Sequence, residues 1–89
     1  MNLAPGKGNV PEDIRRFVIS SFLFGKDGAA LSNDDSFLDK GIVDSTGILE
    51  LIGFLEERFE IKVADEDLLP ENLDSVNRVA AFVSRKLAG

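Results

Sequence analysis

The sequence contains no cysteine and no histidine. Without cysteine there are no disulfides, no thiolate ligands for zinc and no thiol nucleophile. Without histidine the chain lacks the commonest general base near neutral pH and the commonest side-chain ligand of transition metals. A hydrolase of the serine–histidine–aspartate type is therefore excluded, and no convergent set of nucleophile, base and orienting group can be assembled. We predict that the protein is not an enzyme.

Long apolar runs are also missing. The longest are a few residues, whereas a helix that crosses a bilayer needs about 20. No segment has the form of a signal peptide. We therefore expect a protein that does not bind membranes and stays in the cytoplasm, with which the lack of cysteine agrees.

The chain is short, with 89 residues, of which 44% are hydrophobic. That length suits one domain with a modest core and no large preformed cleft, and the composition is too apolar for intrinsic disorder. We expect a flexible N-terminus over residues 1–10, which include two glycines and a proline, followed by one folded unit over 11–89. A monomer that binds, presents or docks is the favoured role.

Negative charge is concentrated in the middle of the chain. Residues 34–71 hold twelve acidic and three basic side chains, and the net charge of the whole chain is −6. Such a surface repels nucleic acids and anionic membranes. It steers basic protein partners toward itself, or it is simply a solvated face that aids solubility.

Apolar residues at spacings of three and four predict three main helices. They would run from about Pro11 to a stop at Gly25, from Asp44 or Ser45 to about Glu60, and from about Leu73 to Leu87. A short helical turn is expected at Asp65–Leu69, ending before Pro70. The expected buried stripes are Ile14, Phe17, Val18, Ser21 and Phe22; then Ile48, Leu51, Ile52, Leu55 and Phe59; then Leu73, Val76, Val79, Ala80, Val83 and Leu87. These elements form a small all-α bundle.

Two features between and within the helices carry further expectations. Residues 25–44 form a long connection, and we expect it to be an ordered loop held over the bundle by its own apolar side chains. Those side chains are Leu31, Phe37, Leu38, Ile42 and Val43. Gly53, inside the second main helix, would allow a close approach of another backbone.

The most informative segment is 41–51, with the sequence GIVDSTGILEL. It ends the long loop and places a serine at the start of an amphipathic helix. Asp44 and Ser45 are both good N-cap residues, because their side-chain oxygens can accept hydrogen bonds from free backbone N–H groups. A hydroxyl in that place can also hold a phosphodiester near the positive end of the helix dipole. Both interpretations fit the segment.

The whole layout resembles the acyl carrier protein family, which has an Asp-Ser-Leu motif at the start of its second helix. Asp44 and Ser45 match the first two positions of that motif. The segments around them are similar to the family in the same order: Gly41–Val43, Leu49–Leu51, Phe54–Ile61, the Asp65–Leu68 segment that is similar to its short third helix, and Asn72–Leu87. The resemblance runs from about residue 11 to the end, so that 11–89 would be the carrier domain. It implies three main helices plus one short helix, with a long first loop.

The resemblance also implies a cofactor and its partners. In the family, a phosphopantetheinyl transferase moves 4′-phosphopantetheine from coenzyme A to the motif serine, which here is Ser45, beside Asp44. A loading ligase or transferase then attaches an acyl or aminoacyl group to the arm as a thioester. Downstream enzymes of fatty acid, polyketide or nonribosomal peptide biosynthesis take up that cargo.

Family members meet these enzymes through the second helix. The resemblance therefore implies that Asp44, Thr46, Glu50, Glu56 and Glu57 contact basic partner surfaces, although each carboxylate could equally belong to a solvated helix face. It also implies a space for an acyl chain, which we expect to be lined by Leu51, Leu55, Ile61 and Val76, unless these residues are simply core.

Two positions depart from the family pattern. Thr46 stands where the family usually has leucine, and Gly47 stands where an acidic residue is common. Enzymes that recognise the leucine would dock less well, so we expect a specialised carrier rather than the housekeeping carrier of fatty acid synthesis.

Two other functions share features of this sequence. The first is an acidic helical interaction module with an unmodified Ser45. The second is a calcium-binding protein, which fails because neither 33–44 nor 65–67 supplies the order of ligands of an EF-hand loop.

Overall fold

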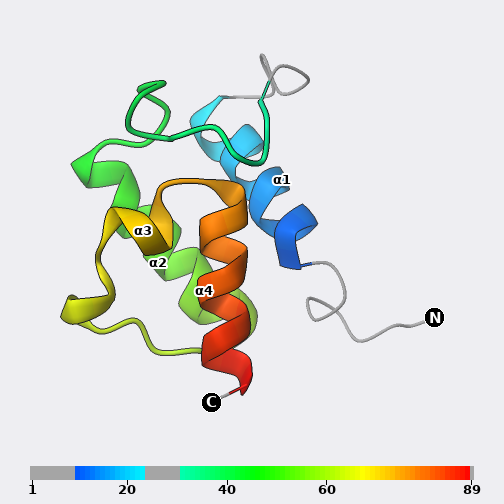
Figure 1. Ribbon diagram of the computed structural model, residues 1–89, viewed down its shortest axis with the longest axis vertical. Helices are drawn as coiled ribbons and strands as arrows, with labels where there is room; N and C mark the ends of the chain where they lie inside the picture. The colour runs from blue at the N-terminus through cyan, green and yellow to red at the C-terminus, as the bar shows by residue number, and fades with distance from the viewer. Residues whose placement is uncertain (1–9, 24–30, 89) are drawn as a thin grey trace.

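The computed structural model describes residues 10–23 and 31–88, and in these ranges the chain is helical and has no strand. The elements are α1 Val10–Phe22, α2 Ser45–Phe59, the 3-10 turn η2 Asp65–Asp67, α3 Pro70–Leu73 and α4 Val76–Ala88. Figure 1 shows their arrangement. The predicted all-α bundle of three main helices and one short helix is confirmed.

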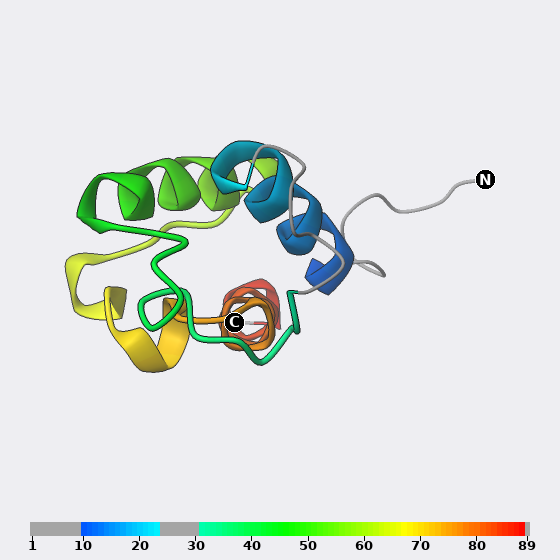
Figure 2. The ribbon, with the colours of Figure 1, turned by 90° about the horizontal axis from the view of Figure 1, so that it is seen from above.

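The core lies between α4 and the other helices. Seen from above, α1 and α2 lie on one side of the molecule and α3 and α4 on the other (Figure 2), and α4 contacts each of the other three. The residues buried here follow the predicted periodicity of three and four. They are Val10, Ile14 and Val18 of α1, Leu51, Leu55 and Phe59 of α2, and Val76, Val79, Ala80, Phe82 and Val83 of α4.

The last turn of α4 differs from its predicted stripe. Leu87 is 37% exposed, whereas Phe82, which was not assigned to the stripe, is only 2% exposed. The predicted stripe follows one line of the helix, but α4 packs against α1, α2 and α3, so its buried face is wider. Leu87 lies in the last turn of α4, at the end of that buried face.

The short helix lies later in the chain than predicted. Of the turn expected at Asp65–Leu69, only Asp65–Asp67 is helical, as a 3-10 turn. A four-residue helix then starts at Pro70, with extended Leu69 before it. Proline excludes a helix through residue 69, as expected, but its fixed φ also suits the first position of a new helix. The final helix begins at Val76 rather than Leu73, because Ser75 accepts a hydrogen bond from the N–H of Arg78 (3.1 Å) and caps it.

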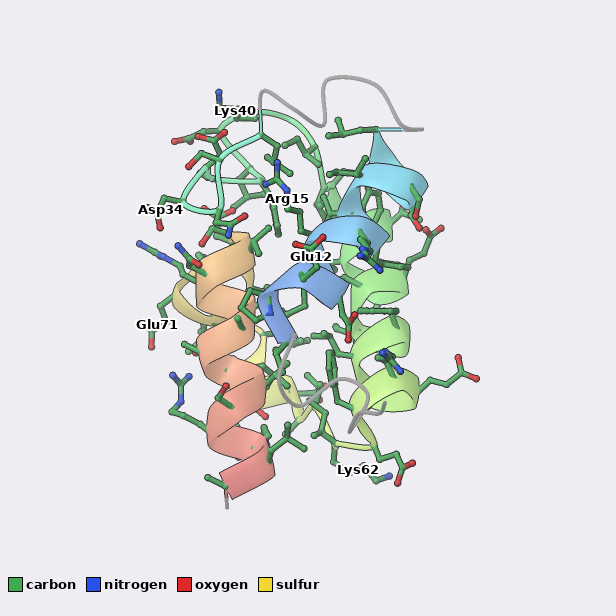
Figure 3. All side chains as sticks on the ribbon, turned by 90° about the vertical axis from the view of Figure 1, so that its right-hand side faces the viewer. Glu12, Arg15, Asp34, Lys40, Lys62 and Glu71 are labelled. Carbon is green, nitrogen blue, oxygen red and sulfur yellow. The ribbon has the colours of Figure 1, made fainter. Side chains whose placement is uncertain are left out.

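The loop over residues 31–44 crosses the top of the bundle from α4 to α2 (Figures 1 and 2). Leu31, Phe37 and Val43 are buried beneath it, as predicted, but Leu38 points outward and is 61% exposed. The loop is tied to α1 by Arg15, whose guanidinium donates to Oδ1 of Asn33 at 3.0 Å (Figure 3).

Three expectations fall wholly or partly outside the described residues. The helix stop at Gly25 and residues 25–30 of the long connection lie there. So do residues 1–9 of the predicted N-terminal segment, whereas Val10 is the first residue of α1 and is buried.

Candidate functional site

Asp44, rather than Ser45, caps the N-terminus of α2. Asp44 has extended backbone angles (φ −103°, ψ −171°), and its Oδ1 accepts the N–H of Gly47 at 2.7 Å. Its carbonyl oxygen accepts the N–H of Ile48 at 2.9 Å, which is the first hydrogen bond of the helix. Of the two N-cap candidates in the sequence, Asp44 therefore satisfies the free backbone donors.

Ser45 is consequently available. It is the first residue of α2 and is exposed, and within the described residues its hydroxyl makes no hydrogen bond to the protein. It lies at the positive end of the helix dipole, where negative charge is stabilised. A phosphodiester on this oxygen would be held in a favourable field without removing the cap of the helix.

Gly47 is buried for a packing reason. A Cβ atom at this position would lie 2.8 Å from Cε1 of Phe22 and 3.3 Å from Cγ1 of Val43. The ring of Phe22, at the end of α1, thus takes the space that a side chain at residue 47 would need. Gly53, by contrast, has nothing within 4 Å of such an atom, so the backbone approach expected there is not found, and the glycine that packing requires is Gly47, against side chains.

A cavity of about 260 Å³ lies beside Ser45, between the loop, α2 and the η2–α3 segment. We call it the Ser45 cavity. Its walls are mainly apolar, and its lining residues are Phe37, Leu38, Val43, Asp44, Ser45, Ile48, Leu68, Leu69, Pro70, Leu73 and Asp74.

The residues predicted to line a space for the cargo are not among them. Leu51, Leu55, Ile61 and Val76 are buried in the core instead. They are therefore core residues, which was the alternative interpretation of these four positions. The sequence pattern could not show that the cavity walls come from the loop and the α3 segment, which meet α2 only in the folded chain.

The predicted partner-binding residues are not equivalent in the structure. Thr46, Glu50 and Glu57 are exposed on α2. Glu56 is half-buried, and its Oε2 accepts the backbone N–H of Val63 at 3.0 Å, so this carboxylate holds the segment after α2 in place.

A group of exposed leucines near Ser45 was not predicted from the sequence. Leu49 is 66% exposed and lies one turn along α2 from Ser45, while Leu38, Leu68 and Leu69 are exposed around the cavity. In the sequence Leu49 lies beside the stripe of Ile48, Leu51, Ile52, Leu55 and Phe59 and not on it, which is the only signal of its exposure. The others belong to loops or segments too short to show a period.

The residues present fit a phosphopantetheine arm on Ser45. Its hydroxyl is exposed, the start of α2 favours a phosphodiester, and an apolar cavity adjoins the site. In the described part of the chain no group of three or more acidic side chains is placed to bind a metal ion. None of its helices is both long enough and apolar enough to cross a membrane.

Known proteins with similar sequences and structures agree with this geometry. A family profile described as "Phosphopantetheine attachment site" matches residues 23–83. An acyl carrier protein of Buchnera aphidicola is 38% identical over 78 residues, which are 88% of this chain and 94% of that one. A D-alanyl carrier protein of Streptococcus uberis is 39% identical over 68 residues, 74% of this chain and 85% of that protein.

The fold is shared as well. The solution NMR structure of a holo acyl carrier protein from Nitrosomonas europaea superposes with a TM-score of 0.75 at 24% identity, covering 89% of this chain and 96% of that chain. On the family profile and on relatives that align over most of their length, the chain belongs to the acyl carrier protein family, whose cofactor is a covalently attached 4′-phosphopantetheine.

Proposed function

We propose that this protein carries acyl or aminoacyl groups as thioesters on a 4′-phosphopantetheine arm attached to Ser45, and that it is a carrier rather than a catalyst. The observation that carries the proposal is that two adjacent residues at the start of α2 have different roles. Asp44 caps the helix, and the exposed Ser45 hydroxyl is left free to react. Residues 11–89 make up the proposed carrier domain.

The chain supplies one reacting atom to the loading step. The Ser45 oxygen attacks the β-phosphate of coenzyme A on a phosphopantetheinyl transferase, with the magnesium ion belonging to that enzyme. A phosphodiester bond forms, adenosine 3′,5′-bisphosphate leaves, and the hydroxyl proton passes to a base of the transferase. The arm, when bound, supplies a terminal thiol that holds cargo as a thioester. Asp44 keeps the helix start in place throughout, so that the dipole faces the new phosphodiester.

Two observations support a specialised carrier. Thr46 is exposed directly after Ser45, so partners that need an apolar residue there meet a hydroxyl instead. The chain also matches a D-alanyl carrier protein and an acyl carrier protein at similar identity. We propose loading by a dedicated ligase or transferase, and handover to downstream enzymes that dock on α2 through Asp44, Thr46, Glu50 and Glu57, with Glu56 supporting that surface.

The intact mass of the protein tests the attachment site. We would incubate the parent, Ser45→Ala and Ser84→Ala with coenzyme A, magnesium and a broad-specificity phosphopantetheinyl transferase. Ser84 is an exposed serine on α4 and serves as the matched control. The parent and Ser84→Ala should each gain the mass of one arm, and Ser45→Ala should gain none.

The opposite result would identify a different function. If the folded parent gains no mass while a known carrier in the same reaction does, Ser45 does not carry an arm. The protein is then an unmodified acidic interaction module.

A further inference from the structure

Asp74 joins the long loop to the junction of α3 and α4 through three consecutive loop residues. Its Oδ2 accepts the hydroxyl of Ser36, and its Oδ1 accepts the backbone N–H of Leu38 at 3.0 Å. Its main-chain oxygen accepts the N–H of Phe37 at 2.7 Å. We call this set, Asp74 with Ser36, Phe37 and Leu38, the Asp74 clamp.

The orientation of the Ser36 hydroxyl is also fixed. Its oxygen accepts the backbone N–H of Asp39 at 3.1 Å, so its single proton is directed to Asp74. Both carboxylate oxygens of Asp74 therefore have donors from the loop. Hydrogen bonds to a charged acceptor are about twice as strong as those between neutral groups.

The clamp forms part of the wall of the Ser45 cavity. Phe37, Leu38 and Asp74 all line the cavity, together with Leu73 next to Asp74. Phe37 is 1% exposed and forms the buried part of the loop wall, while Leu38 forms the exposed lip. The clamp thus sets how far the loop wall stands from the α3 wall.

The loop has other attachments away from the cavity. The backbone N–H of Asn77 donates to the main-chain oxygen of Asn33 at 2.9 Å, and the side-chain amide of Asn77 donates to Oδ1 of Asp34 at 2.5 Å. None of these three residues lines the cavity. Loss of the clamp should therefore widen the cavity locally while the loop stays on the bundle.

We propose that Asp74 is a positioning residue that fixes the width of the Ser45 cavity and so sets the length of the apolar cargo that can shelter there. This proposal rests on the proposed function. A dry cavity of about 150 Å³ holds benzene, with six non-hydrogen atoms. By that scale a cavity of about 260 Å³ holds roughly ten, which corresponds to an acyl chain of about eight carbons.

The clamp itself can be tested on the protein without an arm. Amide hydrogen exchange, followed by NMR, would compare the parent with Asp74→Ala, Ser36→Ala and Asp39→Ala. Asp39 is an exposed acidic residue of the same loop, and no side-chain hydrogen bond of Asp39 is found in the described part of the chain, so its variant is the matched control. Exchange of the Leu38 amide should rise at least tenfold in Asp74→Ala and by a smaller factor in Ser36→Ala. It should stay at the parent rate in Asp39→Ala.

The effect on cargo requires the loaded protein. The transferase would attach arms from coenzyme A thioesters with acyl chains of four, eight and twelve carbons, and hydroxylamine would then cleave the thioesters. In the parent, the eight-carbon thioester should be cleaved several-fold more slowly than the four-carbon one, with no further protection at twelve carbons. In Asp74→Ala and Ser36→Ala the ratio of the cleavage rate of the four-carbon thioester to that of the eight-carbon thioester should shrink at least threefold.

The outcomes separate the clamp from stability and from the proposed function. A merely structural role of Asp74 would lower the melting temperature and speed cleavage at every length by one factor, which would overturn the proposal. The proposal would also be overturned if the folded Ser36→Ala protein keeps both the parent's dependence of cleavage rate on chain length and the parent's exchange rate at Leu38. This variant decides the question if Asp74→Ala does not fold. Failure of the parent to take up any arm would refute the proposed function, whereas the exchange experiment would still decide whether the clamp exists.

Discussion

Gly47 and Gly53 lie in the same helix and carry the same intrinsic cost, but their surroundings differ. Glycine within a helix is about 1 kcal/mol less favourable than alanine. At Gly53 a methyl group would meet nothing within 4 Å, so Gly53→Ala should gain most of that amount. For a chain of this size the melting temperature, measured by circular dichroism, should rise by about 4–8 °C.

Gly47→Ala is the matched comparison. It has the same gain in helix propensity, but its methyl group would lie 2.8 Å from the ring of Phe22. Overpacking of this kind costs roughly 1–3 kcal/mol. We expect the melting temperature to fall or stay unchanged. A rise equal to that of Gly53→Ala would mean that Phe22 moves freely and does not determine the residue at position 47.

At the scale of elements, a carboxylate joins η2 to the last turn of α4. Asp67 accepts a hydrogen bond from Lys86, whose Nζ lies 2.8 Å from Oδ2, and another from the backbone N–H of Ala64 at 3.0 Å. These two hydrogen bonds, with that of Lys86 the larger cause, hold the pKa of Asp67 below its usual 3.8. The folded protein therefore favours the charged form more than the unfolded chain does.

The pH dependence of stability follows from that direction. A lowered pKa in the folded state gives stability that is present above the unfolded pKa and is lost as the pH falls through the folded one. At neutral pH, Asp67→Asn should be less stable than the parent in urea unfolding. The difference should shrink once the pH falls below about 3.8. A difference that is constant down to pH 2 would show that packing, and not charge, is what the substitution removes.

The main helices could be predicted from the sequence because each contains several turns of a regular apolar pattern. The predicted start of α2, Asp44 or Ser45, agrees with the observed start at Ser45 to within one residue. It was predictable because aspartate and serine before an apolar stripe favour an N-cap. The choice between Asp44 and Ser45 depended on backbone angles, which the sequence does not give. Helix α3 was missed because four residues, Pro70–Leu73, are too few to show a period.

The attachment site could be predicted from the sequence, whereas the cavity beside it could not. Ser45 was predictable because a contiguous motif carries it. The Ser45 cavity was not, because Phe37, Ile48 and Leu73 come from separate segments that meet only in the folded chain. The role of Glu56 was also hidden, since its partner is a backbone N–H of Val63, seven residues later in an irregular segment.

At the scale of the whole molecule, the acidic middle of the chain contains the proposed attachment site. Asp44 and Glu50 are exposed before and within the first turns of α2, and residues 34–71 contain only three basic side chains. Opposite charges on two proteins mainly raise the rate of their association, and salt screens this effect. Transfer of the arm by a basic transferase should therefore slow several-fold when ionic strength rises from about 0.02 M to about 0.3 M.

The effect of single charges should decline with distance from Ser45. A helix rises about 1.5 Å per residue, so Glu50 lies about 7.5 Å along α2 from Ser45 and Glu57 about 18 Å, and Glu60 follows the far end of the helix. The screening length is about 10 Å at 0.1 M salt. We expect kcat/KM for arm transfer to fall most in Glu50→Gln, less in Glu57→Gln and least in Glu60→Gln, with the differences vanishing at high salt. Equal losses in all three would mean that the transferase responds to net charge, and a loss that persists at high salt would identify a direct contact to that carboxylate.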